Sequence, residues 1–109
     1  MAKTGFIRHP LYLEHVIDEY HPESPQRLIA IYNMVEQVYK NRLIYVPPRE
    51  ATHEELGWIH DKYYIDSVAR TAGRSVRLDP DTGTSPQSYQ AALLAAGGLT
   101  DADGGCHRF

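Results

Sequence analysis

Histidines are the residues of this chain that could most readily bind a metal or move protons. There are 6 of them, namely His9, His15, His21, His53, His60 and His107. A zinc site needs three or four converging ligands, commonly in short pairs such as Cys-x-x-Cys or His-x-x-x-His. The first three histidines are each six residues apart, which places them on no common helical face. The spacing favours loop and cap histidines bonded to backbone over a metal- or ligand-binding module made of those three.

Two other groups have residue types suited to chemistry but the wrong surroundings. Cys106 and His107 are adjacent, and neighbours in a glycine-rich tail do not hold the nucleophile–base geometry that catalysis requires. Asp79 and Asp81 flank Pro80 like the start of a calcium loop, but the glycine and the distant glutamate of that motif are missing. The residues alone therefore predict no catalytic residue and no metal ligand.

The composition predicts a folded, soluble domain. Of the 109 residues, 42% are hydrophobic and 23% are charged, which is too apolar for a disordered chain. The net charge of −3 gives no electrostatic attraction to nucleic acid. No apolar run approaches the ~18 residues that span a bilayer, and the N-terminus lacks the apolar stretch of a signal peptide. The single cysteine fits a reducing compartment, so we expect a cytoplasmic protein without nucleic-acid or membrane partners.

The first half of the chain predicts two strands and one long helix. Residues 5–8 predict a strand and residues 11–16 a brief helical turn. Ser24 can cap a helix that begins at Pro25, a residue suited to the first helical position. Apolar residues then recur at spacings of three and four and predict one buried stripe, formed by Leu28, Ile31, Tyr32, Val35, Val38 and Tyr39. A second strand follows at residues 43–46.

Two short helices are expected next. Thr52 and Glu55 have the spacing of a capping box and predict a helix that ends near residue 59. Asp61 can cap a second helix over residues 62–71, which would bury Tyr64 or Ile65 together with Val68.

The last third predicts a turn and a helix. Residues 76–78 are briefly extended, and residues 79–84 form a polar turn. An Ala- and Leu-rich helix covers residues 87–96, and Gly97-Gly98 is expected to end it. We therefore expect residues 1–97 to be one structured segment and residues 98–109 to be an irregular tail.

Three motifs, in this order, carry a resemblance to a known family. His21 to Leu28 reads H-P-E-S-P-Q-R-L and matches an H-P-E-x-P-x-R-L entrance motif. Residues 52–68 are similar to a T-x-E-x-L…H-x-x-x-Y-i stretch, and residues 78–97 to an L-D-x-D-T-x-x-S-P-x-S…A-A…A-G segment. Together they resemble the N-terminal portion of the histone deacetylase superfamily, which includes acetylpolyamine amidohydrolases and bacterial acetoin-utilisation deacetylases.

The resemblance implies a fold and an activity. The fold is the α/β, arginase-like one with a parallel central sheet, seen here as helices with two or three short strands. The activity is zinc-dependent hydrolysis of an acetyl-amide on lysine, a polyamine or a related acylated amine, with zinc polarising the acyl carbonyl and activating water.

The family's catalytic parts lie downstream of the matched motifs. They are a tandem histidine pair, an Asp-x-His, a further aspartate and a tyrosine, and none of these motifs appears in this chain. We therefore expect an N-terminal segment of a zinc-dependent deacetylase that is inactive alone, with no catalytic residue and no zinc ligand of its own. The alternative is a non-enzymatic remnant that acts by self-association into a homo-oligomer or by docking to a partner subunit.

Two positions match residues that the family uses for substrate or product. Arg27 matches the arginine of the internal channel through which acetate leaves; otherwise it faces solvent or a local carboxylate such as Glu23. Asp81 matches the rim aspartate that accepts backbone N–H bonds from a peptide substrate; the alternatives are Asp79 in that role, or a turn-forming Asp81. His21 and His60 also match family positions, and we interpret both as structural.

Overall fold

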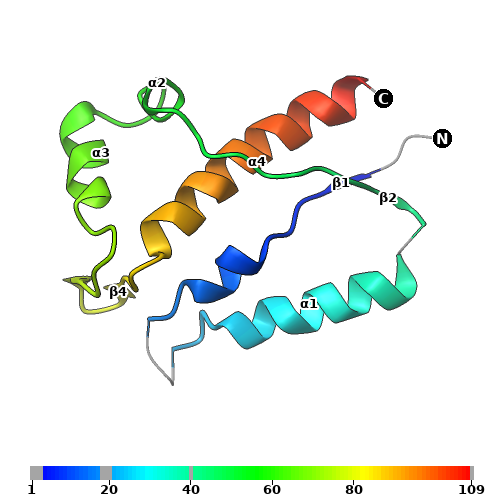
Figure 1. The fold of residues 1–109 in the computed structure, drawn as a ribbon, viewed down its shortest axis with the longest axis horizontal. Helices are drawn as coiled ribbons and strands as arrows, with labels where there is room; N and C mark the ends of the chain where they lie inside the picture. The colour runs from blue at the N-terminus through cyan, green and yellow to red at the C-terminus, as the bar shows by residue number, and fades with distance from the viewer. Residues whose placement is uncertain (1–3, 18–20, 40, 109) are drawn as a thin grey trace.

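The computed structural model describes residues 4–17, 21–39 and 41–108, and it describes side chains as far as residue 101. Helices and short strands alternate along this part of the chain (Figure 1). The elements are β1 (Thr4–Phe6), the 3-10 helix η1 (Pro10–Glu14), α1 (Pro25–Val38), β2 (Leu43–Tyr45), α2 (His53–Leu56), α3 (Lys62–Ala69), β3 (Arg77–Asp79), β4 (Thr82–Gly83) and α4 (Ser88–Arg108). None of the described helices combines the length and apolar character needed to cross a membrane.

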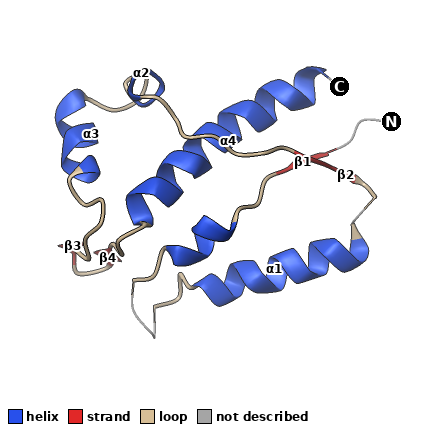
Figure 2. Cartoon of the chain, in the orientation of Figure 1, coloured by secondary structure: helices blue, strands red, loops and turns tan. Residues whose placement is uncertain are grey.

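The strands β1 and β2 form a parallel pair, as Figure 2 shows. Gly5 lies opposite Ile44 in the register, and the amide of Val46 donates to the carbonyl of Phe6 at 3.0 Å. A parallel connection needs a crossover rather than a tight turn, and α1 lies in that crossover. The β3 and β4 strands form a separate antiparallel pair. This mixture of helices with a parallel pair is the α/β architecture that the sequence predicts.

The two predicted helix caps of the middle region are confirmed. Thr52 and Glu55 form a complete capping box at the start of α2, and the Asp61 carboxylate accepts from the Tyr64 amide at 2.8 Å. The predicted cap of α1 differs: the Ser24 side chain makes no cap hydrogen bond, and its backbone carbonyl accepts from the Arg27 amide instead. Pro25 alone suits the first position of this helix, because it has no N–H to satisfy.

The apolar stripe of α1 is only partly covered. Val35 is buried, and the ring of Tyr32 packs edge-on against Phe6 with the ring centres 6.3 Å apart. By contrast, Ile31 and Val38 are exposed. The prediction of one buried stripe is therefore right for the side that faces η1 and β1 and wrong for the remainder.

The predicted end of the last helix at Gly97-Gly98 is wrong, and so is the irregular tail from residue 98 as far as residue 108. Helix α4 continues through both glycines to Arg108, and Phe109 lies outside the described residues. Once a helix is started, each further residue adds one hydrogen bond, which offsets the ~1 kcal/mol that a glycine costs in a helix interior. The two glycines allow neighbouring segments to pack closely against α4, and they do not end the helix.

Gly97 lies where α4 crosses the segment that links β2 to α2 (Figure 1). A Cβ atom at Gly97 would overlap the carbonyl oxygen of Arg49 and would lie 2.8 Å from the amide nitrogen of Ala51. Near this crossing the Ala51 amide donates to the carbonyl of Leu93 at 2.9 Å. Only glycine lets two backbones approach this closely.

Ion pairs of Arg49 with Glu55 and Asp101 also connect α4 to the segment that it crosses. Arg49 donates two 2.7 Å hydrogen bonds to the Glu55 carboxylate and a third, from Nε, to Asp101 of α4 at 3.1 Å. The bonds from Arg49, together with the amide of Thr52, lower the pKa of Glu55 to about 2. The bonds from Arg49 to Glu55, followed by the bond to Asp101, raise the pKa of Arg49.

Replacing Gly97→Ala tests the crossing. We expect it to lower the free energy of unfolding by about 2 kcal/mol or more, because the added methyl group meets backbone atoms that have no room to move. The matched control is Gly98→Ala, whose Cβ would meet only side-chain atoms of Ile7 and Pro48, at 3.2 Å and beyond. It should change stability by less than about 1 kcal/mol, since alanine also favours the helix. Equal losses of stability for the two variants in urea denaturation would contradict the close backbone approach at Gly97.

The Arg49–Glu55 pair predicts a pH dependence. A carboxylate with a lowered folded-state pKa stabilises the fold above its usual pKa of 4.5, and this stabilisation is lost as the pH falls toward about 2. We expect Glu55→Gln to lower the melting temperature most above pH 4.5, with the difference from wild type shrinking below it. Glu54→Gln, an exposed neighbour in the first turn of α2, is the control. If the difference in melting temperature between wild type and Glu55→Gln stays constant from pH 7 to pH 3, the Arg49–Glu55 pair is not its cause.

Candidate functional site

Two of the family-like motifs meet at His21 and Asp81. The Nε2 atom of His21 lies 2.9 Å from the Asp81 carboxylate and 3.1 Å from its backbone carbonyl. The two residues are 60 positions apart in the sequence. The loop before α1 is therefore joined to the turn between β3 and β4, a contact that no local sequence pattern predicts.

Asp79 and Asp81 have different roles in the turn between β3 and β4. Asp79 accepts the Asp81 amide at 2.8 Å, and this bond, followed by one from the Thr82 hydroxyl, lowers the pKa of Asp79. The Asp81 side chain is 91% exposed. The Asp79 carboxylate thus accepts hydrogen bonds within the turn, whereas the Asp81 carboxylate is accessible to solvent.

Arg27 is an exposed residue in the first turn of α1. Its side chain forms no ion pair with Asp81, whose carboxylate meets His21 instead. The local alternative, Glu23, lies 3.9 Å from His15. In the described part of the chain, Arg27 therefore faces solvent, and its channel role remains a prediction.

A cavity of about 370 Å³ lies between η1, the start of α1 and α4. Its lining includes Tyr12, His15, Glu23, Leu28, Ser88 and Ala91. Leu28, the neighbour of Arg27, is the contribution of α1. Burial raises the pKa of Tyr12, whose hydroxyl donates to the carbonyl of Leu94 at 3.0 Å.

Ser88 is the polar centre of this cavity, and sequence reasoning missed it. It is buried, and its hydroxyl oxygen lies 2.6 Å from Nδ1 of His15 and accepts from the Ser85 amide at 2.8 Å. Ser85 in turn donates to the carbonyl of Glu14. The Ser-x-x-Ser spacing ahead of an alanine-rich run was the available signal, because such serines satisfy the free amides at helix starts.

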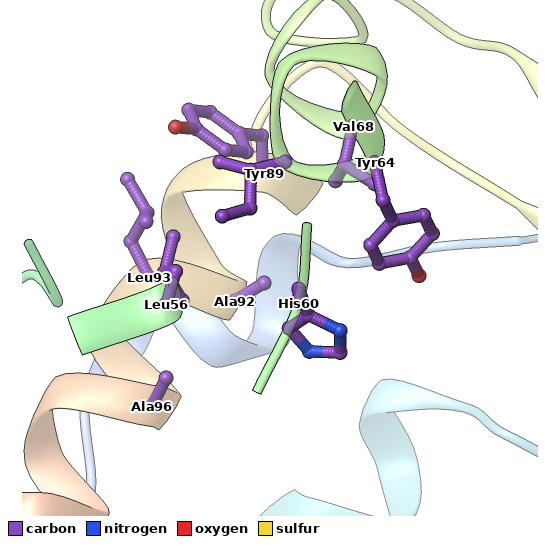
Figure 3. A pocket seen from close by; sticks show the side chains of 9 residues that line it. Leu56, His60, Tyr64, Val68, Tyr89, Ala92, Leu93 and Ala96 are labelled. Carbon is purple, nitrogen blue, oxygen red and sulfur yellow. The ribbon is translucent and has the colours of Figure 1, made fainter. Parts of the chain in front are cut away.

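A second cavity, of about 230 Å³ and mostly apolar, lies between α3, α4 and the end of α2. Its lining consists of Leu56, His60, Tyr64, Ile65 and Val68 together with α4 residues from Tyr89 to Ala96 (Figure 3). The rings of His60 and Tyr64 lie 5.0 Å apart. Of the alternatives Tyr64 and Ile65, Ile65 is buried and Tyr64 is exposed, and Val68, which was also predicted to be buried, is only partly buried.

The residues of the described segments do not fit a zinc site. Within them, no three histidine, cysteine, aspartate or glutamate side chains come close enough together to hold a metal ion. His9 accepts the Leu11 amide, while His15 and His21 have the partners given above. The side chains of Cys106 and His107 lie outside the described residues.

Comparison with known proteins places this geometry in a fold class. The structure matches the crystal structure of the HDA15 HD domain with a TM-score of 0.82 and 29% identity, over 91% of this chain and 30% of that one. The α/β deacetylase fold predicted from the motifs is therefore confirmed.

The sequence comparisons give the family. The model of the histone deacetylase domain matches residues 21–103, so the chain belongs to the histone deacetylase family. A probable deacetylase of Archaeoglobus fulgidus is 29% identical over 87% of this chain, and the acetoin utilization protein AcuC of Bacillus subtilis is 31% identical over 94%. The matched part makes up only 27% and 30% of those two proteins.

Replacing Ser88→Ala tests the polar centre of the first cavity. We expect a loss of about 1–3 kcal/mol in the free energy of unfolding, because the Ser85 amide and the His15 ring lose a buried partner. Ser67→Ala, an exposed serine of α3, is the control and should change stability by less than about 0.5 kcal/mol. Thermal denaturation of both variants tests this prediction. Similarly small losses of stability in the two variants would contradict the assignment of Ser88 as the polar centre of the cavity.

Proposed function

We propose that this chain is the N-terminal part of a zinc-dependent deacetylase that hydrolyses the acetyl-amide of lysine, a polyamine or a related acylated amine. The observation that carries the proposal is the bond between His21 and Asp81. It joins two motif segments inside the region that matches the family model, and it leaves the Asp81 carboxylate at the surface.

Zinc would supply the Lewis acid for this hydrolysis, and it would be bound by residues other than those described here. The contribution of this chain is to bind and orient. The guanidinium of Arg27 offers five donors in a fixed plane, which suits a carboxylate product such as acetate. Asp81 can accept N–H bonds from a substrate at the rim. We further propose that the isolated chain is inactive and that the protein is cytoplasmic.

A second candidate is a non-enzymatic protein that self-associates or docks to a partner subunit. Large apolar side chains around the start of α3 favour it: Trp58 is 67% exposed, and Ile59 and Tyr63 are each 82% exposed. Adjacent exposed residues of this size commonly mark an interaction surface. Light scattering after size-exclusion chromatography tests this second candidate. A folded monomer at high concentration would contradict the need for an obligate partner.

A chimaera tests the first proposal directly. In it, this chain replaces the matching segment of the Archaeoglobus fulgidus probable deacetylase, after deacetylation by that parent protein has been verified. We expect the chimaera to deacetylate an acetyl-lysine peptide or an acetylated polyamine and to lose this activity to a chelator. The isolated chain with added zinc should show none.

Within the chimaera, Arg27→Ala should lower turnover, because it removes the donors for the carboxylate product, and Arg42→Ala serves as the control in an exposed loop position. Chelator-sensitive turnover by the isolated chain would overturn the expected inactivity. A folded chimaera without activity would overturn the deacetylase assignment.

A further inference from the structure

The outward side of α3 presents an aromatic ring together with two opposite charges. Tyr63, Ser67 and Arg70 recur at helical spacing, and all three are exposed. Ile65, on the opposite side of the helix, is buried. Asp66 lies beside this exposed stripe, one turn before Arg70. Figure 1 shows α3 at the outer edge of the molecule, and we call Tyr63, Asp66, Ser67 and Arg70 the α3 face.

Large apolar side chains surround the start of the α3 face. Tyr63 and Ile59 are each 82% exposed, and Trp58, in the turn before α3, is 67% exposed. Leaving three such side chains in water forfeits the free energy that their burial would supply. Tyrosine and tryptophan are also enriched in the contact surfaces of proteins. This part of the surface therefore favours contact with another protein.

The charges of the α3 face favour one kind of partner. Asp66 and Arg70 are opposite in charge and have the four-residue spacing at which helical side chains commonly pair. Among the described residues, however, neither side chain has an ion-pair partner. Both charges are thus available to a second molecule. In an antiparallel crossing of two α3 helices about a two-fold axis, each Asp66 lies near Arg70 of the other copy, so the α3 face complements itself.

We propose that the α3 face is a dimer interface, through which two copies of this chain pack with their α3 helices antiparallel and two reciprocal Asp66–Arg70 ion pairs. Tyr63 and Ile59 of each copy become covered in this arrangement. Ser67, the small residue of the stripe, allows a short distance between the helices where they cross. The inference rests on the self-association candidate above, to which it gives a surface, and it does not depend on the deacetylase activity.

Charge exchange tests the interface in the full chain. Sedimentation over a concentration series should show a monomer–dimer equilibrium for the wild type. Asp66→Arg and Arg70→Asp each place like charges opposite one another, so each should raise the dissociation constant of the dimer about tenfold or more. An equimolar mixture of the two variants should restore the wild-type affinity, because both ion pairs form again across the mixed dimer with their charges exchanged.

Two further variants separate the interface from general effects of charge or folding. Arg42→Asp reverses a charge at an exposed position outside α3 and is the matched control, for which we expect the wild-type dimer affinity. Tyr63→Ser removes apolar contact area and leaves both charges in place. Because this side chain is so exposed, its replacement should not change the melting temperature of the monomer, while it should weaken the dimer about tenfold.

A wild-type chain that stays monomeric up to ~1 mM would overturn the proposal. A dimer that the α3 variants do not weaken would reject it too, since the contact would then lie on another surface. A mixture of Asp66→Arg and Arg70→Asp that stays monomeric would contradict the antiparallel pairing. The deacetylase assignment fails separately, through an inactive chimaera.

Discussion

At Gly97, the backbone of α4 lies against the backbone of residues 49–51 with no side chain between them. Several other contacts of α4 lie close to this approach. It brings the Leu93 carbonyl to the Ala51 amide, Asp101 to Arg49, and Gly98 against Ile7 beyond β1. The helix thus connects the parallel strand pair with the capping box of α2, and it does so through geometry that a single methyl group would disturb.

The polar contacts of the candidate site follow from the position of α4. The start of this helix brings Ser88 to His15, which ties it to the chain just after η1. The turn between β3 and β4 precedes α4 and carries Asp81, whose bond to His21 reaches the loop before α1. Two segments that are far apart in sequence, the connection from η1 to α1 and the stretch from the β3–β4 turn to the start of α4, are thus joined by side chains, and that is where substrate contacts are proposed.

Sequence patterns predicted what depends on neighbouring residues. The capping box at Thr52, the Asp61 cap and the start of α1 at Pro25 are short-range hydrogen-bonding and steric effects, and all three are found. The parallel sheet came only with the family resemblance. The function of Gly97 was misjudged because glycine both weakens a helix and allows close packing, and only the position of residues 49–51 shows which applies. The bond between His21 and Asp81 spans 60 residues, beyond any local pattern.

The parallel pairing of β1 with β2 also has a consequence for how the chain folds. The paired residues Thr4 and Leu43 cannot meet through a tight turn, because a parallel connection must first pass through α1. Closing such a loop costs entropy before the strands gain any hydrogen bonds, whereas the helical turns form from nearby residues. We therefore expect the helices to form early and the sheet to form late, so that the rate of strand pairing limits the appearance of the native state.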